Sequence, residues 1–324
     1  MTPVHPITQD IFQIRIPVPF PLKYVNCYLF RENSGWTLLD TALNDEPGLR
    51  AWAHVFDELK IAPRDIHRII LTHTHPDHFG LAGYFQNASG APVYALDREI
   101  VTVPLVWRDD RAHVEMLDAY FLQHGVPPHV VENIEERSRL LVQWTHPLPQ
   151  FTQLHENEIV ALGEHNYRVV WTPGHADGHM MLFCADNGAL FAGDMILAKI
   201  TPNIGLWPES EPNPLKSYLA SLEKTDALRA QIAFTGHRAV IENVSTRIQE
   251  LRVHHAERAQ ACWDAARECS AYDIALQTFK RLENAEDVRM ALVETLSHLE
   301  YLVSEGRAEK LEGTVTRYRR IASQ

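Results

Sequence analysis

Hydrophobic and polar positions in the first hundred residues predict strands that alternate with helices. Residues 46–59 carry apolar side chains at helical spacing, whereas 66–71 is a short apolar run of the kind that forms a buried strand. A turn signal at Asn33-Ser34-Gly35 separates two earlier strand patterns, so we expect a mostly antiparallel opening. The predicted elements are strands at 11–17, 26–30, 36–40, 66–71 and 92–96, and helices at 46–59 and 79–85.

A second half repeats this pattern after an interruption. Residues from about 99 to 150 are helix-like, punctuated by prolines and rich in large side chains, and we interpret them as a helical insertion. The insertion either roofs a pocket or is a plain packing subdomain. Strand patterns resume at 151, and a helix at 214–224 with a strand at 232–235 completes the half. Two β-rich halves with helices outside predict an α/β fold, a four-layer αββα sandwich.

Beyond Asn243 the pattern becomes almost entirely helical. The expected elements are helices at 245–269, 270–279 and 285–305, and a hairpin with Gly313 at its turn. Three helices and a hairpin predict a winged-helix-like domain. The chain therefore divides into a large domain at 1–243, with the insertion inside it, and a small domain at 244–324.

Composition and charge limit the classes of molecule that the protein is expected to bind. The 324 residues include 30 Lys plus Arg against 42 Asp plus Glu, a net charge of −12, which disfavours nucleic acid as a partner. No run reaches the roughly 18 apolar residues of a membrane span, so we expect no membrane partner and a cytoplasmic location. The four cysteines form no C-x-x-C pair, whereas the 18 histidines are an excess typical of a metal site.

The strongest motif is His73-Thr74-His75-Pro76-Asp77-His78, directly after the predicted strand 66–71. Alternate residues of an extended segment point the same way, so His73 and His75 should converge on one point. The turn after Pro76 should bring Asp77 and His78 onto a second point close by. Six residues can therefore serve two metal ions.

Three further strand ends carry metal-binding side chains in a consistent order. His175 follows a tight turn at Thr172-Pro173-Gly174, and His237 follows Thr235-Gly236. Asp194 follows Gly193, where the glycine permits close backbone approach and two carboxylate oxygens can bridge two cations. Each motif alone is weak, but together they indicate one metal centre.

These motifs resemble those of the metallo-β-lactamase superfamily over the first three quarters of the chain. By that resemblance His73, His75 and His175 hold one metal, Asp77, His78 and His237 hold a second, and Asp194 bridges them. Asp40 would orient a ligating histidine by accepting its ring N–H. Zinc suits this nitrogen-rich site, with two ions per chain expected, and iron or manganese remain alternatives.

The resemblance implies a hydrolase whose nucleophile is a metal-bridging hydroxide, with Asp77 steering it or carrying its proton. We expect a small-molecule substrate, namely an ester, thioester or lactone. One alternative is a ribonuclease or phosphodiesterase, because the C-terminal stretch resembles that of a lactamase-like branch containing a ribonuclease, and its hairpin is basic. Another is a mono-iron persulfide dioxygenase. The C-terminal domain is expected to pack against the insertion or to build a homodimer.

Other residues are given simpler interpretations. His179 is expected to pack or to support the site rather than to bind metal, and His254 and His255 are predicted to lie at the surface. Trp207 and the aromatic residues of the insertion either line an acyl or aryl pocket or pack in the core.

Overall fold

A computed structural model describes residues 3–108 and 110–322 of the chain. Its first sheet has seven strands in the order of the sequence, β1 to β7. The strands are antiparallel from β1 to β4 and parallel from β4 to β7. Their bounds are β1 Val4–Pro6, β2 Ile11–Pro17, β3 Tyr24–Glu32, β4 Gly35–Leu39, β5 Ile66–Ile70, β6 Val93–Leu96 and β7 Phe151–Leu154.

The second sheet has five strands in the order β12-β11-β10-β9-β8. All neighbours are antiparallel except the parallel pair β11 and β12. The bounds are β8 Ile159–Leu162, β9 His165–Trp171, β10 Met180–Phe183, β11 Ala189–Gly193 and β12 Ile232–Thr235.

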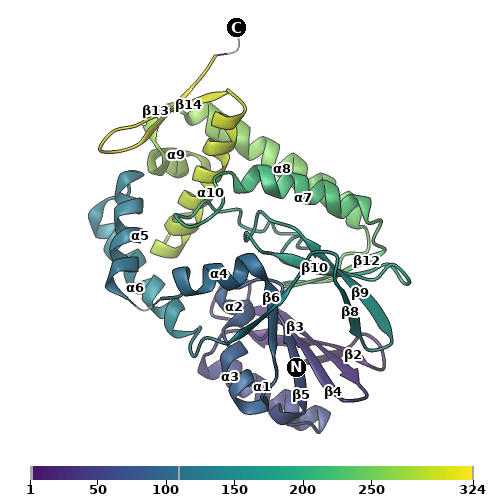
Figure 1. The fold of residues 1–324 in the computed structure, drawn as a ribbon. Coiled ribbons are helices and arrows are strands. Elements are labelled where there is room, and N and C mark those ends of the chain that lie inside the picture. Colours follow the sequence, from purple (N-terminus) through teal and green to yellow (C-terminus); the bar gives the residue numbers. More distant parts are fainter. Residues whose placement is uncertain (1–2, 109, 323–324) are drawn as a thin grey trace.

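Hydrophobic clusters define four layers. Facing side chains of the two sheets, among them Phe30 and Phe191, form the central cluster. A second cluster joins the outer face of the first sheet to α1 (Glu46–Leu59) and α3 (Ala82–Ser89). A third joins the outer face of the second sheet to α7 (Pro214–Ala227) and α8 (Val244–Ala265). The predicted αββα sandwich is thereby confirmed, with α1 and α3 on one side and α7 and α8 on the other (Figure 1).

Most predicted elements of the sandwich are present, with two corrections. The helix predicted over 79–85 is instead two helices, α2 (Pro76–Phe79) and α3. Proline lacks an N–H and has a helical φ, so Pro76 can start the helix three residues before the predicted start. The strand at 151–154 completes the first sheet beside β6 and does not belong to the second half.

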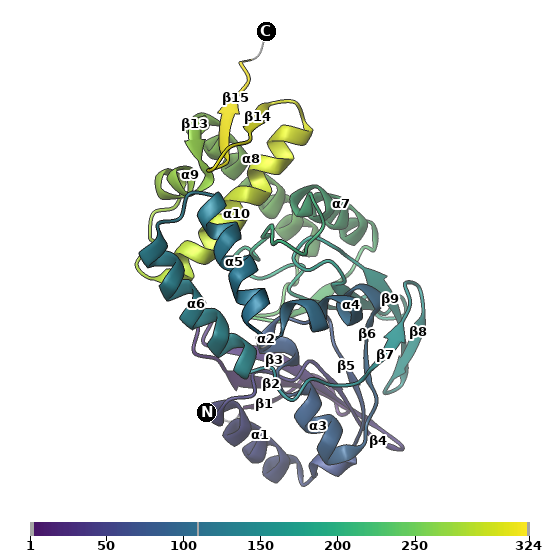
Figure 2. The same cartoon turned by 60° about the vertical axis from the view of Figure 1, so that its left-hand side comes forward.

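The insertion consists of α4 (Asp97–Val106), α5 (Arg111–Gln123) and α6 (Pro128–Gln143). Apolar side chains of α5 and α6, including Phe121 and Ile134, share one cluster with the C-terminal helices. Figure 2 shows α5 and α6 beside α10. Trp207 packs against that cluster too, so for α5, α6 and Trp207 the core-packing interpretation holds.

The C-terminal part contains α8, β13 (Arg267–Ser270), α9 (Ala271–Thr278), α10 (Ala285–Ser304), β14 (Ala308–Leu311) and β15 (Arg317–Arg320). The helix predicted over 245–269 ends at Ala265, because the backbone of 267–270 pairs with β15 as the edge of a three-stranded sheet. Ser270 caps α9 as predicted, accepting a hydrogen bond from the N–H of Asp273. The winged-helix description and the domain boundary at 243/244 stay predictions.

The prediction of a surface position for His255 is wrong. Its side chain is buried between α8 and α10, where its ring stacks on that of His298. The apolar pattern of α8 alone did not reveal that α10 covers the face of α8 that carries His255. Among the residues that the structure describes, no helix is both long and apolar enough to cross a membrane.

Candidate metal centre

The loop after β5 places four of the predicted side chains. The strand ends at Ile70, and the loop passes through Thr72 to the start of α2 at Pro76. His73 and His75 come close, with Nε2 of the first 3.1 Å from Nδ1 of the second. Asp77 and His78 lie within α2, and the carbonyl of His78 accepts a hydrogen bond from the N–H of Thr41 at 2.6 Å. The helical turn brings the ring of His78 to 4.2 Å from that of His73, centroid to centroid, so the two pairs lie side by side.

The second sheet brings the remaining three side chains. His175 lies in the loop between β9 and β10, Asp194 directly follows β11, and His237 follows β12. A side chain at Gly236 would place its Cβ 2.7 Å from the ring of His78, so only glycine lets this strand end approach so closely. The carbonyl of Thr235 accepts hydrogen bonds from Asn26 and Tyr28 of β3, which fix the strand end against the first sheet.

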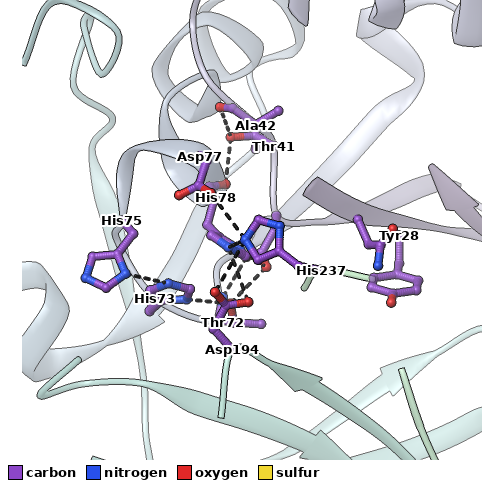
Figure 3. Close-up of polar contacts among 12 residues, drawn as sticks. Tyr28, Thr41, Ala42, Thr72, His73, His75, Asp77, His78, Asp194 and His237 are labelled. Atoms are coloured by element: carbon purple, nitrogen blue, oxygen red, sulfur yellow. Dashed lines mark hydrogen bonds and ion pairs between the residues drawn. The ribbon is translucent and has the colours of Figure 1, made fainter. Parts of the chain in front are cut away.

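All seven predicted metal ligands meet between the two sheets. Figure 3 shows this meeting point for the predicted ligands other than His175. We name His73, His75 and His175 the first donor group, and Asp77, His78 and His237 the second donor group. In each group the donor atoms lie within 4.8 Å of one another, and Asp194 makes a similar group with His73 and His78. Oδ2 of Asp194 lies 3.7 Å from His175 Nε2 and 3.4 Å from His237 Nε2, so Asp194 stands between the two groups.

Hydrogen bonds on the far side of the rings orient the donor atoms. Nδ1 of His78 donates to Asp40 Oδ2 at 2.9 Å, and Nδ1 of His237 donates to the carbonyl of Tyr24 at 2.9 Å. Nδ1 of His175 donates to the carbonyl of Asn203 at 2.8 Å. Each ring therefore presents Nε2 to the centre, an arrangement typical of metal-ligating histidines. Asp40 lies where the sequence predicts an orienting carboxylate.

Two of the buried side-chain atoms that lack a hydrogen bond belong to this centre. Nε2 of His175 and Oδ1 of Asp194 make no hydrogen bond among the described residues, although both atoms are shielded from solvent. Buried polar atoms without partners are rare, because leaving them unpaired is unfavourable. Nitrogen and carboxylate donors of this kind are those that Zn²⁺ and other first-row metals prefer, so the residues fit a metal centre.

The two donor groups differ in electrostatics. Burial lowers the pKa of His73 well below its usual range and lowers that of His75 to about 3. Burial alone would also lower the pKa of His237, but Asp194 and Asp77 outweigh it and raise that pKa to about 10. For His78, Asp194 and Asp40 likewise outweigh burial and raise the pKa well above its usual range.

The carboxylates respond in the opposite direction. Burial would raise the pKa of Asp77, but the hydrogen bond from His237 lowers it to about 2. The neighbouring His237 and His78 also hold the pKa of Asp194 well below its usual range against the effect of burial. The protein alone therefore keeps positive charge in the second donor group, where a cation would sit between carboxylates.

Glu99 and Asn203 support the site but have no signal in the sequence, whereas His179 was expected to support it. Glu99, at the start of α4 and only 3% exposed, accepts hydrogen bonds from the backbone N–H of Thr74 and of Gly178, both at 2.8 Å. It thereby ties the two ligand loops together. Nε2 of His179 accepts a hydrogen bond from the N–H of Asp194 at 3.2 Å, in agreement with the supporting role expected for it. Glu99 and Asn203 lie outside every motif, so only the structure identifies them.

Comparisons with known proteins agree with this geometry. The Metallo-beta-lactamase superfamily matches residues 21–237, and the family described as Metallo-beta-lactamase-like, C-terminal domain, matches residues 256–321. The crystal structure of metallo-beta-lactamase family protein TTHA1429 from Thermus thermophilus is similar, with 35% identity and a TM-score of 0.88. The alignment covers 98% of this chain and 100% of that one.

Two curated proteins of similar sequence have names that describe an enzymatic activity. "Probable metallo-hydrolase YqjP" of Bacillus subtilis is 24% identical over 308 residues, covering 92% of this chain and 93% of the relative. "Atrochrysone carboxyl ACP thioesterase" of Aspergillus fumigatus is 29% identical over 142 residues, covering 43% of this chain and 42% of the relative. Because the superfamily match spans more than half of the sequence, the chain belongs to the metallo-β-lactamase superfamily and is a metallo-hydrolase.

Proposed function

We propose that the chain is a binuclear metal-dependent hydrolase that cleaves a small ester, thioester or lactone. The observation that carries this proposal is the convergence of two donor groups on either side of Asp194. His175 Nε2 and Asp194 Oδ1, buried without hydrogen-bond partners, support the assignment. When bound, a pair of ions would supply hydroxide at neutral pH and a counter-charge for the oxygen of the attacked carbonyl.

The residues of the chain have separate tasks in this proposal. Asp194 would bridge, because its Oδ2 lies within 3.7 Å of a histidine from each donor group. Asp40 would hold the Nε2 of His78 toward the centre. A pKa lowered to about 2 makes Asp77 a weak base at neutral pH, so orienting the nucleophile suits it better than carrying a proton.

We propose zinc as the metal, with two ions per chain, because five of the seven donors are imidazole nitrogens. Iron and manganese are the alternatives. A mono-iron dioxygenase needs one metal only, and the presence of a complete second donor group therefore favours hydrolysis.

The charge of a neighbouring cleft, which none of the seven donors lines, supports a small substrate that is not a polyanion. A cleft of about 440 Å³ reaches the loop of His175 through Asp177. Asp97, Glu209 and Glu211 line the same cleft, opposed by Arg98. A nucleic-acid backbone would meet these carboxylates, and the net charge of −12 adds to the repulsion. The name of one curated relative, a thioesterase, agrees with an ester-like bond as the target, and the other is named a metallo-hydrolase without a stated bond.

The basic hairpin gives the ribonuclease alternative little support. Arg319 pairs with Glu309 at 2.7 Å, and Lys310 pairs with Glu300 at 3.0 Å. Arg320 lies over the ring of Trp263. Because intramolecular partners engage these side chains, we propose that the C-terminal part packs and does not bind RNA. A cytoplasmic location and a homodimer are further proposals, which remain to be tested by fractionation and by sedimentation.

A parallel activity screen tests the proposed function. Protein of measured metal content is assayed on S-lactoylglutathione, an acyl homoserine lactone, a nitrophenyl ester, a β-lactam and single-stranded RNA. Two zinc ions per chain and turnover of an ester, thioester or lactone are expected, both abolished by a chelator. One iron with oxygen consumption, or cleavage of RNA alone, would contradict the proposal.

A further inference from the structure

An irregular segment supports one of the proposed metal ligands. Residues 194–213, which lead from β11 to α7, contain no helix or strand, and all of them are described. Asn203 lies in this segment, and its carbonyl accepts the hydrogen bond from His175 Nδ1 at 2.8 Å. No local repeating structure fixes the position of this carbonyl, so contacts from elsewhere in the fold must do so.

Helix α10 supplies those contacts. Nδ2 of Asn203 donates to Glu294 Oε2 at 2.9 Å and to the carbonyl of Met290 at 3.2 Å. The N–H of Leu206 donates to the carbonyl of Val293 at 3.0 Å. Val293 and Glu294 follow Met290 by three and four residues, so both lie on the same side of the helix as Met290. One face of α10 therefore holds the segment at several points.

The packing at this contact is tight. A Cβ at Gly205 would lie 2.8 Å from a methyl carbon of Val293, so the backbone of the segment lies directly against α10. A displacement of α10 would therefore move the carbonyl of Asn203. Because that carbonyl orients His175, the effect would reach Nε2, which faces Asp194 at 3.7 Å.

Glu294 is an unusual residue for a helix interior. The residue is 7% exposed, and its second oxygen lies 3.9 Å from the guanidinium of Arg258 on α8. Burial raises the pKa of Glu294 to about 7, although Arg258 and Asn203 favour its charged form. A buried carboxyl group is unfavourable unless it is hydrogen-bonded, and Asn203 provides the direct hydrogen bond.

We propose that Glu294, acting through Asn203, is a positioning residue for the metal ligand His175, which makes α10 a working part of the metal centre. This inference rests on the proposed function, because it assumes that the first donor group binds metal. It assigns a role to the C-terminal part that requires neither nucleic acid nor a second subunit.

Zinc affinity of the full-length chain tests this proposal. Glu294→Ala and Asn203→Ala remove the acceptor and the donor of the contact, whereas Glu294→Gln keeps an acceptor. Glu300→Ala is the matched control, because Glu300 lies on the same helix but bonds Tyr318 and Lys310 of the hairpin. Competition with a chromophoric chelator measures affinity, the absorption of bound Co²⁺ reports ligand geometry, and thermal melting reports stability.

Glu294→Ala and Asn203→Ala should each weaken one of the two zinc sites about tenfold or more, the effect typical of changes behind a metal ligand. They should also alter the Co²⁺ spectrum. Glu294→Gln and Glu300→Ala should bind zinc as the natural chain does, even if Glu300→Ala lowers the melting temperature.

Unchanged affinity and spectrum in Asn203→Ala would overturn the inference, as would equal weakening by Glu300→Ala, which would indicate general loosening of α10. If Glu294→Ala does not fold, Asn203→Ala and Glu294→Gln decide the question. If the unsubstituted chain binds no metal, the proposed function itself fails, and that result is distinguishable from the failure of the inference alone.

Discussion

The two donor groups lie side by side between the same sheets, yet they differ in charge. Burial lowers the pKa values of His73 and His75 in the first donor group, whereas carboxylates raise those of His78 and His237 in the second. Histidines of the first group are therefore available to bind metal at neutral pH, whereas those of the neighbouring second group must first lose a proton. The difference shows that the neighbours of a histidine, rather than its presence in a motif, decide how it competes with protons for a metal.

The largest effect is expected from replacing Asp194, the carboxylate that lies between the two donor groups. In Asp194→Ala both donor groups lose their common partner, so we expect the metal content after reconstitution to fall toward zero and turnover to fall more than about a hundredfold. Elemental analysis and the activity assay measure the two effects. Asp57→Ala, at an exposed position of α1, serves as the control. A variant that keeps two ions and full activity would refute the bridging assignment.

Two variants, each lacking one histidine of one donor group, should show whether the two groups bind their ions independently. His175→Ala should leave a single ion in the second donor group, and His237→Ala should leave a single ion in the first. Native mass spectrometry counts the ions. Loss of both ions in each variant would mean that the groups bind metal only as one unit.

Metal binding should depend on pH mainly through the second donor group. His237 has a pKa raised to about 10 and His78 a pKa raised well above its usual range, so both carry protons at pH 7 in the metal-free chain. Each must lose its proton to bind metal, so binding at pH 7 should release about two protons, and affinity should rise with pH. Calorimetry in buffers of different ionisation enthalpy measures the release.

The pH dependence of metal affinity should also differ between the two donor groups. His73 and His75 have lowered pKa values, so the affinity of the first donor group should hardly change between pH 6 and pH 8. The second ion should be lost first as the pH falls. Equal pH dependence of both ions would contradict the contrast.

The smallest effect is expected from Asp40→Asn. Asp40 has φ +58°, a left-handed conformation that asparagine tolerates, so the backbone should be preserved. The amide oxygen can still accept from His78, but the negative charge is lost, and the amide nitrogen in place of Oδ1 cannot accept the N–H of Thr72. We expect about tenfold weaker metal binding at the second donor group and no change at the first, measured by chelator competition. Equal loss at both groups would point to general damage.

The sequence by itself determined the sandwich and indicated the candidate metal donors. Its strand and helix patterns predict α1 and β12 with their observed bounds, because the periodicity of apolar residues follows from which face is buried. Four of the seven donors were recognisable from the motif at 73–78, which follows a predicted strand, and His175, Asp194 and His237 from turn or glycine signals at further strand ends. The assignment of all seven to one pair of ions came from the resemblance to the family. The predicted start of the helix at 79 was three residues too late, since helix starts depend on local backbone hydrogen bonds that the spacing of apolar residues does not report.

Tertiary structure decided what lies behind the donors. Glu99, Asn203 and Glu294 belong to no motif, and each acts through a partner between 25 and 91 residues away. His255 was placed at the surface because a single helix does not reveal what covers it. Contacts of this kind exist only after distant segments pack, so hydrophobic periodicity and local motifs, which report on neighbouring residues, contain no record of them.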